Sequence, residues 1–385
     1  MMFSRTLSLV GLATFATLAS SATTIEWTAI APLPTARSDL SATVSTATGE
    51  DAIYLIGGCD ADQLSGEYGF YCPSVTARCD AYNPAINKYT PCAAAPGARY
   101  RHAAVNIDGK VWLVGGDDAA DNGAAYKDIE YYDPATDTWT TFGTWDGATT
   151  DCAAFAIGTD LYIVGGYNPT DWAYTAQSAV YKVDTTADTL ALTLVAELPT
   201  ARGDIFATVA DDHVYVTGGY THTDDYCAPL HVTERYDLIE HTWDAVANTI
   251  YNRGDKALVH MNDFLYAIGG ETKVDCGDSV PVELVEIYDI KNDVWVADTV
   301  IPSATFRFVA VGDDNSDAIY LFGGQLPQTT CTVDDVATQC YPVTTKALKF
   351  VDTEWVVEAL DAAASGVYVA KIALGVAAIM VAAIM

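Results

Sequence analysis

A pair of adjacent glycines recurs six times along this chain at nearly even spacing. The first glycines of the pairs are separated by 50 to 58 residues, and an aromatic residue precedes each by three positions. Glycine permits positive φ and close backbone approach, so each pair predicts the end of a strand in a tightly packed place. The six pairs begin at Gly57, Gly115, Gly165, Gly218, Gly269 and Gly323. They predict six similar β units, none of which can bury its own faces alone.

Each unit continues in a similar way after its glycines. A loop of variable length leads to a second strand that ends in a turn with Asn or Asp. Six residues after that turn residue come Tyr89, Trp139, Leu190, Trp243 and Trp295 in the first five units. The pattern resembles the kelch repeat, which forms one four-stranded propeller blade.

The resemblance covers roughly residues 27 to 360 and implies an all-β chain that folds as a six-bladed β-propeller of four-stranded antiparallel blades. The family includes enzymes, scaffolds and cell-surface proteins, so the fold alone does not assign a function. Ring closure stays open at this point. The segments around Trp27 and Trp355 both match the outermost strand, which gives seven candidates for six positions.

Both ends of the chain are apolar. Residues 1–22 have the pattern of a cleaved signal peptide, and residues 23–360 are expected to form the propeller. Residues 361–385 match a glycosylphosphatidylinositol (GPI) attachment signal, with Ala363, Ala364 and Ser365 as candidate attachment residues. A transmembrane tail is the alternative, although it would carry Lys371 inside the span. We therefore expect a monomer of the secretory pathway, secreted or anchored at the extracellular face of the plasma membrane.

Nine cysteines in an exported chain indicate disulfides with one thiol left over. In the repeat frame Cys79 and Cys92 fall opposite each other on paired strands. Two other pairs would each close a loop within one blade, a third could join neighbouring loops, and Cys152 remains as a buried thiol. The three pairs are Cys59 with Cys72, Cys331 with Cys340, and Cys227 with Cys276.

The formal charge of −32 makes nucleic acid an improbable partner, and cations, basic proteins or plain solubility explain it better. The longest loops after the glycines occur in the first and sixth units, which are neighbours in a closed ring. They predict a disulfide-stiffened wall on one face, suited to an asymmetric partner. Neutral drift of exposed loops explains the same lengths equally well.

Aligning the starts of the inner strands predicts a charged ring at the mouth of the central channel. The ring contains Asp39, His102, Asp151, Asp204, Asp255 and Arg307, with Arg37, Arg101, Arg202 and Arg253 close by. One interpretation is structural, with Arg–Asp pairs that join adjacent blades. The other is a pocket for a charged ligand, since the kelch proteins that the chain resembles commonly bind partners or substrates with arginines at this mouth. We assign no metal, because propeller symmetry spreads the carboxylates apart.

Two Arg-Gly-Asp tripeptides, at 202–204 and 253–255, match an adhesion motif but occupy identical repeat positions, which favours a structural role. We predict a binding module whose loop-rich face meets a protein or a glycan, without catalytic residues or cofactor. The alternative is a secreted carbohydrate-active enzyme, epimerase-like or oxidase-like, at the channel mouth. The six histidines do not form a copper-binding set of the oxidase kind.

Overall fold

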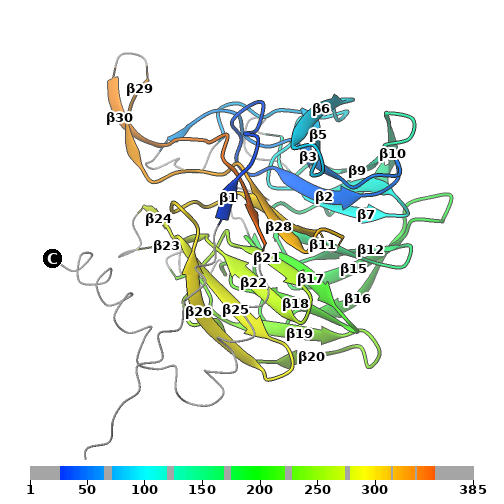
Figure 1. The fold of residues 1–385 in the computed structure, drawn as a ribbon. Helices are drawn as coiled ribbons and strands as arrows, with labels where there is room; N and C mark the ends of the chain where they lie inside the picture. The colour runs from blue at the N-terminus through cyan, green and yellow to red at the C-terminus, as the bar shows by residue number, and fades with distance from the viewer. Residues whose placement is uncertain are drawn as a thin grey trace, which may run out of the picture.

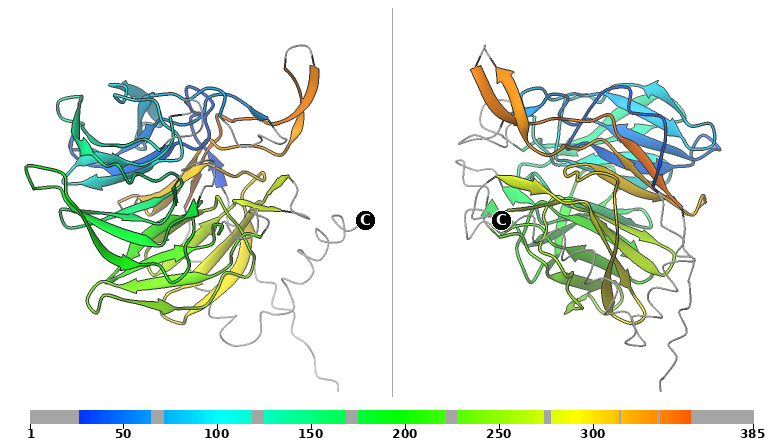
Figure 2. Two further views of the ribbon diagram at one scale, coloured as in Figure 1. Left: turned by 180° about the vertical axis from the view of Figure 1, so that it is seen from behind. Right: turned by 60° about the vertical axis from the view of Figure 1, so that its left-hand side comes forward.

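The computed structural model describes residues 27–64, 72–118, 125–168, 175–221, 228–273, 278–313, 315–333 and 336–351. Every regular element in these ranges is a β-strand, and six four-stranded antiparallel sheets stand around a central axis (Figures 1 and 2). The expected all-β, six-bladed propeller is therefore confirmed. In the described ranges no helix is long and apolar enough to cross a membrane. The expected signal peptide, the C-terminal attachment signal and Trp355 lie outside these ranges.

Each blade runs from an inner strand beside the channel to an outer strand at the rim. The first contains β2 (Ser41–Ser45), β3 (Ala52–Ile56), β5 (Cys79–Asn83) and β6 (Lys88–Cys92). The second contains β7 (Ala103–Ile107), β8 (Lys110–Val114), β9 (Asp128–Asp133) and β10 (Thr138–Thr144). The third contains β11 (Ala153–Ile157), β12 (Asp160–Val164), β15 (Ala179–Asp184) and β16 (Leu192–Glu197).

The other three blades repeat this order. The fourth contains β17 (Phe206–Ala210), β18 (His213–Thr217), β19 (Thr233–Asp237) and β20 (Thr242–Ala245). The fifth contains β21 (Ala257–Met261), β22 (Phe264–Ile268), β25 (Leu284–Asp289) and β26 (Val294–Val300). The sixth contains β27 (Val309–Asp313), β28 (Ala318–Phe322), β31 (Ala347–Phe350) and β1 (Trp27–Ala29).

The N-terminal strand closes the ring. Trp27 to Ala29 pair with Phe350 to Leu348 in antiparallel register, so β1 is the outermost strand of the sixth blade. The question that the sequence left open is thus answered for the Trp27 segment. Because the first strand completes the last blade, the two ends of the propeller hold each other in place.

The hydrophobic cores lie between blades. Leu55 and Tyr82 of the first blade pack with Tyr320 and Phe322 of the sixth, while Tyr54 on the other face of β3 packs against the second blade. Side chains of the second strands alternate between the two neighbouring blades, as a pleated strand requires. A single blade therefore has no core of its own, which explains why six repeats must close.

In three blades the recurring aromatic residue of the outer strand donates a hydrogen bond to the backbone of the preceding blade. Trp139 Nε1 donates a hydrogen bond to Ala93 O at 2.8 Å, and Trp295 Nε1 does the same to Ala247 O at 2.9 Å. Tyr89 makes the equivalent bond through its hydroxyl to Ala31 O, also at 2.9 Å. The recurring aromatic of the sequence thus reaches into the neighbouring blade.

The loops after the double glycines carry the remaining strands, β4 (Gln63–Leu64), β13 (Tyr167–Asn168), β14 (Thr175–Ala176), β23 (Glu271–Lys273), β24 (Ser279–Pro281), β29 (Thr329–Val333) and β30 (Val336–Tyr341). The β29–β30 hairpin of the sixth blade projects from the disc in all three ribbon views (Figures 1 and 2). Strand β30 also pairs with β4 of the first blade, where Cys340 lies opposite Leu64 and Tyr341 opposite Gln63. The two longest loops therefore form one three-stranded sheet across the closing seam.

Candidate functional site at the channel mouth

Four buried arginines near the start of the inner strands act within the blades. Arg202 Nη2 lies 2.6 Å from Glu234 on the third strand of its own blade, and Arg202 also donates to Gly218 O and Val232 O. The other three pairs are Arg37 with Asp80, Arg99 with Glu130, and Arg253 with Glu286. All eight side chains are at most 4% exposed. The side chains of Arg37, Arg202 and Arg253 therefore turn away from the mouth. Each one joins the second and third strands of its own blade.

The same residues fasten neighbouring blades through their backbone. The carbonyl of Arg202 accepts a hydrogen bond from Gly166 N of the preceding blade, and the carbonyl of Arg37 accepts one from Gly324 N. A Cβ on Gly323 would lie 2.2 Å from Arg37 O, so only glycine permits this approach. Arg37, Arg202 and Arg253 therefore pair within their own blades, and the Arg–Asp pairs that join adjacent blades are made by Arg101 and Arg307.

Burial lowers the pKa of Arg37 to about 10 even though Asp80 opposes the shift. The third and sixth blades place Thr149 and Thr305 at the arginine position, and Tyr181 and Leu348 occur where the acid would stand. Arginine and acid are therefore present together or absent together in this chain.

The ring at the mouth lies two residues further along each repeat. Its six members share a left-handed backbone with φ between 49° and 56°, and they are Asp39, Arg101, Asp151, Asp204, Asp255 and Arg307. The prediction placed His102 in the second blade, and the structure corrects this to Arg101. The two residues are adjacent. In the other blades the inner strand begins two residues after the ring position, and β7 begins at Ala103, one residue earlier than a ring position at His102 would require.

His102 lies one layer below the ring, between the first and second blades. Its Nε2 is 2.6 Å from Ser41 Oγ, and a Cβ on Gly57 would meet its ring at 2.7 Å. Burial, followed by the charge of Arg99, lowers the pKa of His102 well below its ordinary value. A neutral, packed histidine is a poor candidate for the acid or base of an enzyme in the channel.

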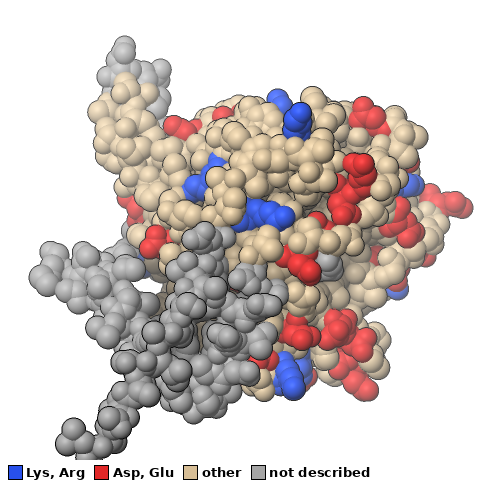
Figure 3. All heavy atoms as spheres, viewed as in Figure 1, with Lys and Arg blue, Asp and Glu red and all other residues tan. Residues whose placement is uncertain are grey.

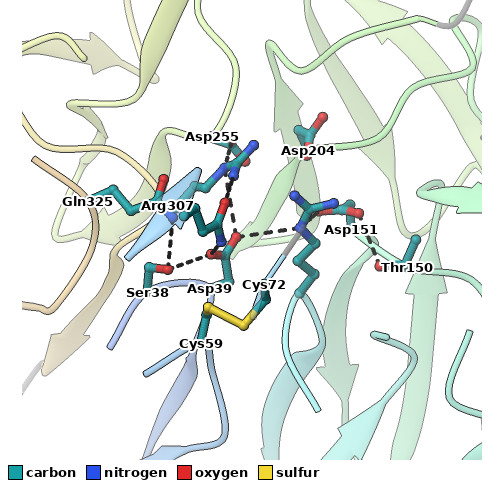
Figure 4. Close-up of polar contacts among 12 residues, drawn as sticks. Ser38, Asp39, Cys59, Cys72, Thr150, Asp151, Asp204, Asp255, Arg307 and Gln325 are labelled. Carbon is teal, nitrogen blue, oxygen red and sulfur yellow. Dashed lines mark hydrogen bonds and ion pairs between the residues drawn. A yellow bond between two sulfur atoms is a disulfide. The ribbon is translucent and has the colours of Figure 1, made fainter. Parts of the chain in front are cut away.

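One half of the ring neutralises its own charge. Arg101 lies 3.6 Å from Asp39 and from Asp151, while Arg307 lies 3.0 Å from Asp255 and 3.8 Å from Asp39 (Figure 4). Asp39 also accepts hydrogen bonds from Ser38 Oγ at 2.6 Å and from Gln63 Nε2 at 3.1 Å. Asp39 is thus enclosed by two guanidinium groups and two neutral donors.

The opposite half contains three consecutive carboxylates. Among the described residues Asp204 has no ion-pair partner, and the Tyr167 hydroxyl donates to it at 2.8 Å. Asp204 is partly exposed, whereas Asp151 and Asp255 are 9% and 8% exposed. Loss of solvation in the channel mouth raises the pKa of Asp204 well above its ordinary range, and the charges of Asp255 and Asp151 raise it further. Asp204 therefore holds a proton to higher pH than a free aspartate.

A second layer covers this half of the mouth. Tyr220 donates its hydroxyl to Glu271 Oε1 at 2.9 Å, and burial raises the pKa of Glu271, with Asp255 adding to the effect. The tyrosine rings need room below them: a Cβ on Gly203 would lie 2.3 Å from Tyr167, and one on Gly254 would lie 2.0 Å from Tyr220. This explains both Arg-Gly-Asp tripeptides, which supply a buried ion pair, a space for tyrosine and a ring carboxylate.

A cavity of about 400 Å³ lies in the channel and reaches the ring. All six inner strands line it, and its walls below the ring combine apolar side chains such as Ala153, Phe206 and Val309 with polar ones such as Ser41 and Thr208. The described residues contain no group of three or more His, Cys, Asp or Glu side chains that could hold a metal ion. On the outer surface, acidic side chains gather along the right-hand side of Figure 3, where Figure 1 shows the outer strands of the second, third and fourth blades.

Sequence reasoning missed several residues of this region. Arg99 was missed because the alignment placed the second blade one residue too far along the chain, the same error that put His102 in place of Arg101. The four acids of the blade ion pairs could have been found, because each stands three residues before the turn residue. Tyr167, Tyr220 and Glu271 share the position after the double glycine, yet nothing in that pattern shows that their side chains reach the mouth.

Three of the four expected cysteine pairs lie in the described ranges, with Cα–Cα distances that a disulfide can span. The Cα–Cα distance is 5.7 Å for Cys59 and Cys72, 5.1 Å for Cys79 and Cys92, and 6.0 Å for Cys331 and Cys340. Cys79 and Cys92 stand directly opposite in the strand register. Cys227 and Cys276 lie outside the described residues. Cys152 is a buried free thiol, and burial raises its pKa to about 12.

The fold and the mouth define a six-bladed β-propeller with a charged channel entrance beside a loop wall. The chain is a kelch-repeat β-propeller: residues 98–144 and 201–249 match the family model described as the kelch motif. Kelch-like protein 23 of Homo sapiens is 24% identical over 253 residues, which are 66% of this chain and 40% of that protein. Beta-scruin of Limulus polyphemus is 27% identical over 248 residues, which are 63% of this chain and 26% of that protein.

This chain thus spans well under half the length of these curated relatives. Among solved structures, the one titled "Structure of YjhT" superposes with a TM-score of 0.62 at 14% identity and covers 80% of this chain and 99% of its own. This likeness shows the fold alone.

Proposed function

We propose that this protein is an exported kelch propeller that binds a protein partner on its loop-rich face. Kelch propellers commonly bind proteins, which supports the class of function. Support for export comes from three cysteine pairs placed close enough for disulfides, because disulfides persist in oxidising compartments. The apolar patterns of residues 1–22 and 361–385 point the same way.

The sheet formed by β29, β30 and β4 carries the proposal. It joins the longest loops of two neighbouring blades, and Val343 N donates to Asp62 Oδ1 at 3.0 Å beside it. Gln63 of this sheet reaches into the mouth, where it binds Asp39 and Arg307. A wall fixed at one side of a polar entrance offers a partner both a stable surface and a defined orientation.

Site-specific photocrosslinking on producing cells tests this proposal. A photoreactive amino acid replaces Ala337, exposed on the β29–β30 hairpin, or Ala135, exposed in the β9–β10 turn. We expect a crosslinked protein adduct from position 337 and none from position 135. An adduct only from position 135, or no adduct from either, would contradict a loop-face protein contact, and a carbohydrate adduct at position 337 would favour a glycan.

The alternative, a carbohydrate-active enzyme, has one observation in its favour. Burial and the neighbouring carboxyl groups raise the pKa of Asp204 well above its ordinary value, and a carboxyl group that keeps its proton can act as a general acid. An Asp204→Asn variant that lost turnover of a glycan while keeping its fold would support this function over binding.

Export and anchoring need a separate experiment. Intact eukaryotic cells that express the full chain are treated with phosphatidylinositol-specific phospholipase C. Release into the medium supports a lipid anchor, whereas retention with residues 372–385 still detected by mass spectrometry shows a membrane-spanning tail instead.

A further inference from the structure

The charges at the mouth are unevenly balanced around the ring. Both arginines approach Asp39, which also accepts hydrogen bonds from Ser38 and Gln63. Asp151 and Asp255 each have one arginine partner, and Asp204 has none among the described residues. Four carboxyl groups face two guanidinium groups, and Asp204, the one without an ion-pair partner in the described part of the chain, retains its proton to higher pH instead. Charge in such a partly desolvated place favours a compensating group more strongly than charge on open surface.

A buried acceptor next to this half of the mouth points the same way. Glu271 is 2% exposed and lies close enough to Asp255 and Arg307 for their charges to act on it. Its Oε1 accepts from Tyr220, while its Oε2 has no hydrogen-bond partner among the described residues. Glu271 therefore adds a further carboxyl group behind Asp255, and a cation held at Asp255 would be favourable for it as well.

The space at the mouth fits a particular shape of ligand. Beyond the carboxylates the cavity of about 400 Å³ continues between the alanine, valine and phenylalanine side chains of the inner strands. A charged head on an apolar stem matches this sequence of polar rim and apolar wall. A bare metal ion does not, because the described residues offer no convergent ligand set. An anion is disfavoured because both ring arginines are engaged by carboxylates.

We infer that the mouth binds the side chain of an arginine or lysine of the protein partner, whose cationic head enters between Asp151, Asp204 and Asp255. This rests on the proposed protein-binding function and adds which part of the partner enters the channel. The guanidinium or ammonium group replaces the missing counter-charge at Asp204. The stem contacts the apolar wall, and the β29–β30 hairpin lies beside the chain that carries this side chain.

Calorimetric titration of the full-length protein with a short peptide tests the inference. The probe is acetyl-Gly-Arg-Gly-amide, and its matched control carries citrulline, which keeps the shape of arginine without the charge. We expect the citrulline peptide to bind at least about tenfold more weakly, and Asp204→Asn to weaken the arginine peptide by about the same factor. Asparagine is nearly isosteric and tolerates the left-handed backbone at this position, so the variant should fold.

Two further variants separate a local effect from a general change of charge. Asp212→Asn removes one carboxylate in the exposed β17–β18 turn of the same blade and should leave the affinity unchanged. Glu271→Gln should weaken binding. Repeating the titration in buffers with different heats of ionisation should show proton release on binding near neutral pH by the wild type and none by Asp204→Asn.

Equal affinity for the arginine and citrulline peptides, full affinity in Asp204→Asn, or no binding at millimolar peptide would each overturn the inference. If those results came with a protein crosslink from position 337, the binding function would stand and only the cationic anchor would be wrong. If the peptide bound as expected and no crosslink formed, the mouth would remain a cation site and the loop-face contact would fail.

Discussion

The paired presence of arginine and acid predicts how a blade responds when half of the pair is removed. Replacing Arg202 by Thr leaves Glu234, 4% exposed, without its guanidinium partner. Replacing both, Arg202→Thr with Glu234→Leu, gives the fourth blade the combination that Thr305 and Leu348 provide in the sixth. We expect the single variant to be much less stable than the double variant, although the double variant carries more changes.

The structure sets the size of this difference. Removing one partner of a buried pair costs about 3–5 kcal/mol, because the remaining charge is unpaired in a low-dielectric site. A buried carboxylate can escape by taking up a proton, which for an ordinary glutamate costs about 3.7 kcal/mol at pH 7 and about 1.6 kcal/mol at pH 5.5. The penalty in Arg202→Thr should therefore shrink by about 2 kcal/mol between these two pH values. In the double variant no carboxylate remains, and the loss should not depend on pH.

Urea unfolding of the wild type, both single variants and the double variant gives the four free energies of unfolding needed for the cycle at each of pH 7 and pH 5.5. The argument predicts strong positive coupling between the two sites at pH 7. It would be refuted if the two single losses simply added, or if the loss in Arg202→Thr were the same at both pH values. A loss in Arg202→Thr that is equal at pH 7 and pH 5.5 would mean that the pair contributes packing volume and not charge compensation.

Three other features give smaller predictions. Trp139→Phe removes the hydrogen bond to Ala93 O and should lower the free energy of unfolding by about 1 kcal/mol. Trp243→Phe should lower it less, because Trp243 Nε1 has no hydrogen-bond partner in the described ranges. Equal losses in the two variants would argue against a stabilising role for this hydrogen bond between blades. His102, whose pKa burial holds well below 6.5, binds a proton more readily in the unfolded chain, so stability should fall as pH drops through 6.5. Unfolding between pH 5 and 7.5 should show a shallower slope for His102→Leu, and an unchanged slope would contradict this. Non-reducing peptide mapping should recover Cys79 linked to Cys92, Cys59 to Cys72 and Cys331 to Cys340, and a free thiol at Cys79 would contradict the strand register.

The repeat made most of the fold predictable. Double glycines mark the same backbone position six times because a carbonyl of the next blade approaches to where a Cβ would be, as Arg202 O does at Gly165, 2.7 Å from such an atom. The spacing of these pairs placed four ring aspartates correctly. It failed in the second blade because adjacent Arg101 and His102 are both polar, and only the left-handed φ of Arg101 shows which one faces the mouth.

Other parts of the site depend on contacts between distant segments. Trp27 and Trp355 are equivalent as sequence patterns, and pairing of β1 with β31 is a fact of ring closure that no local pattern contains. Gln63 lies in an irregular loop, yet it binds Asp39 and Arg307 because β4 pairs with a hairpin from the last blade. The sequence predicted that two long loops would be neighbours, but their shared sheet required the three-dimensional structure.

The ring position separates conformation from charge. Aspartate tolerates the left-handed backbone well, whereas arginine adopts it at a cost of about 1 kcal/mol or more, so six aspartates would be the least strained ring. Six carboxylates in one channel mouth would also repel each other strongly. The two arginines, both next to Asp39, relieve that repulsion most strongly on one side, and among the described residues Asp204 on the other side has no direct ion pair. Arg37, Arg99, Arg202 and Arg253 pair with other acids inside their blades, so they do not neutralise the ring, and the inferred cationic side chain would supply the charge that the ring lacks at Asp204.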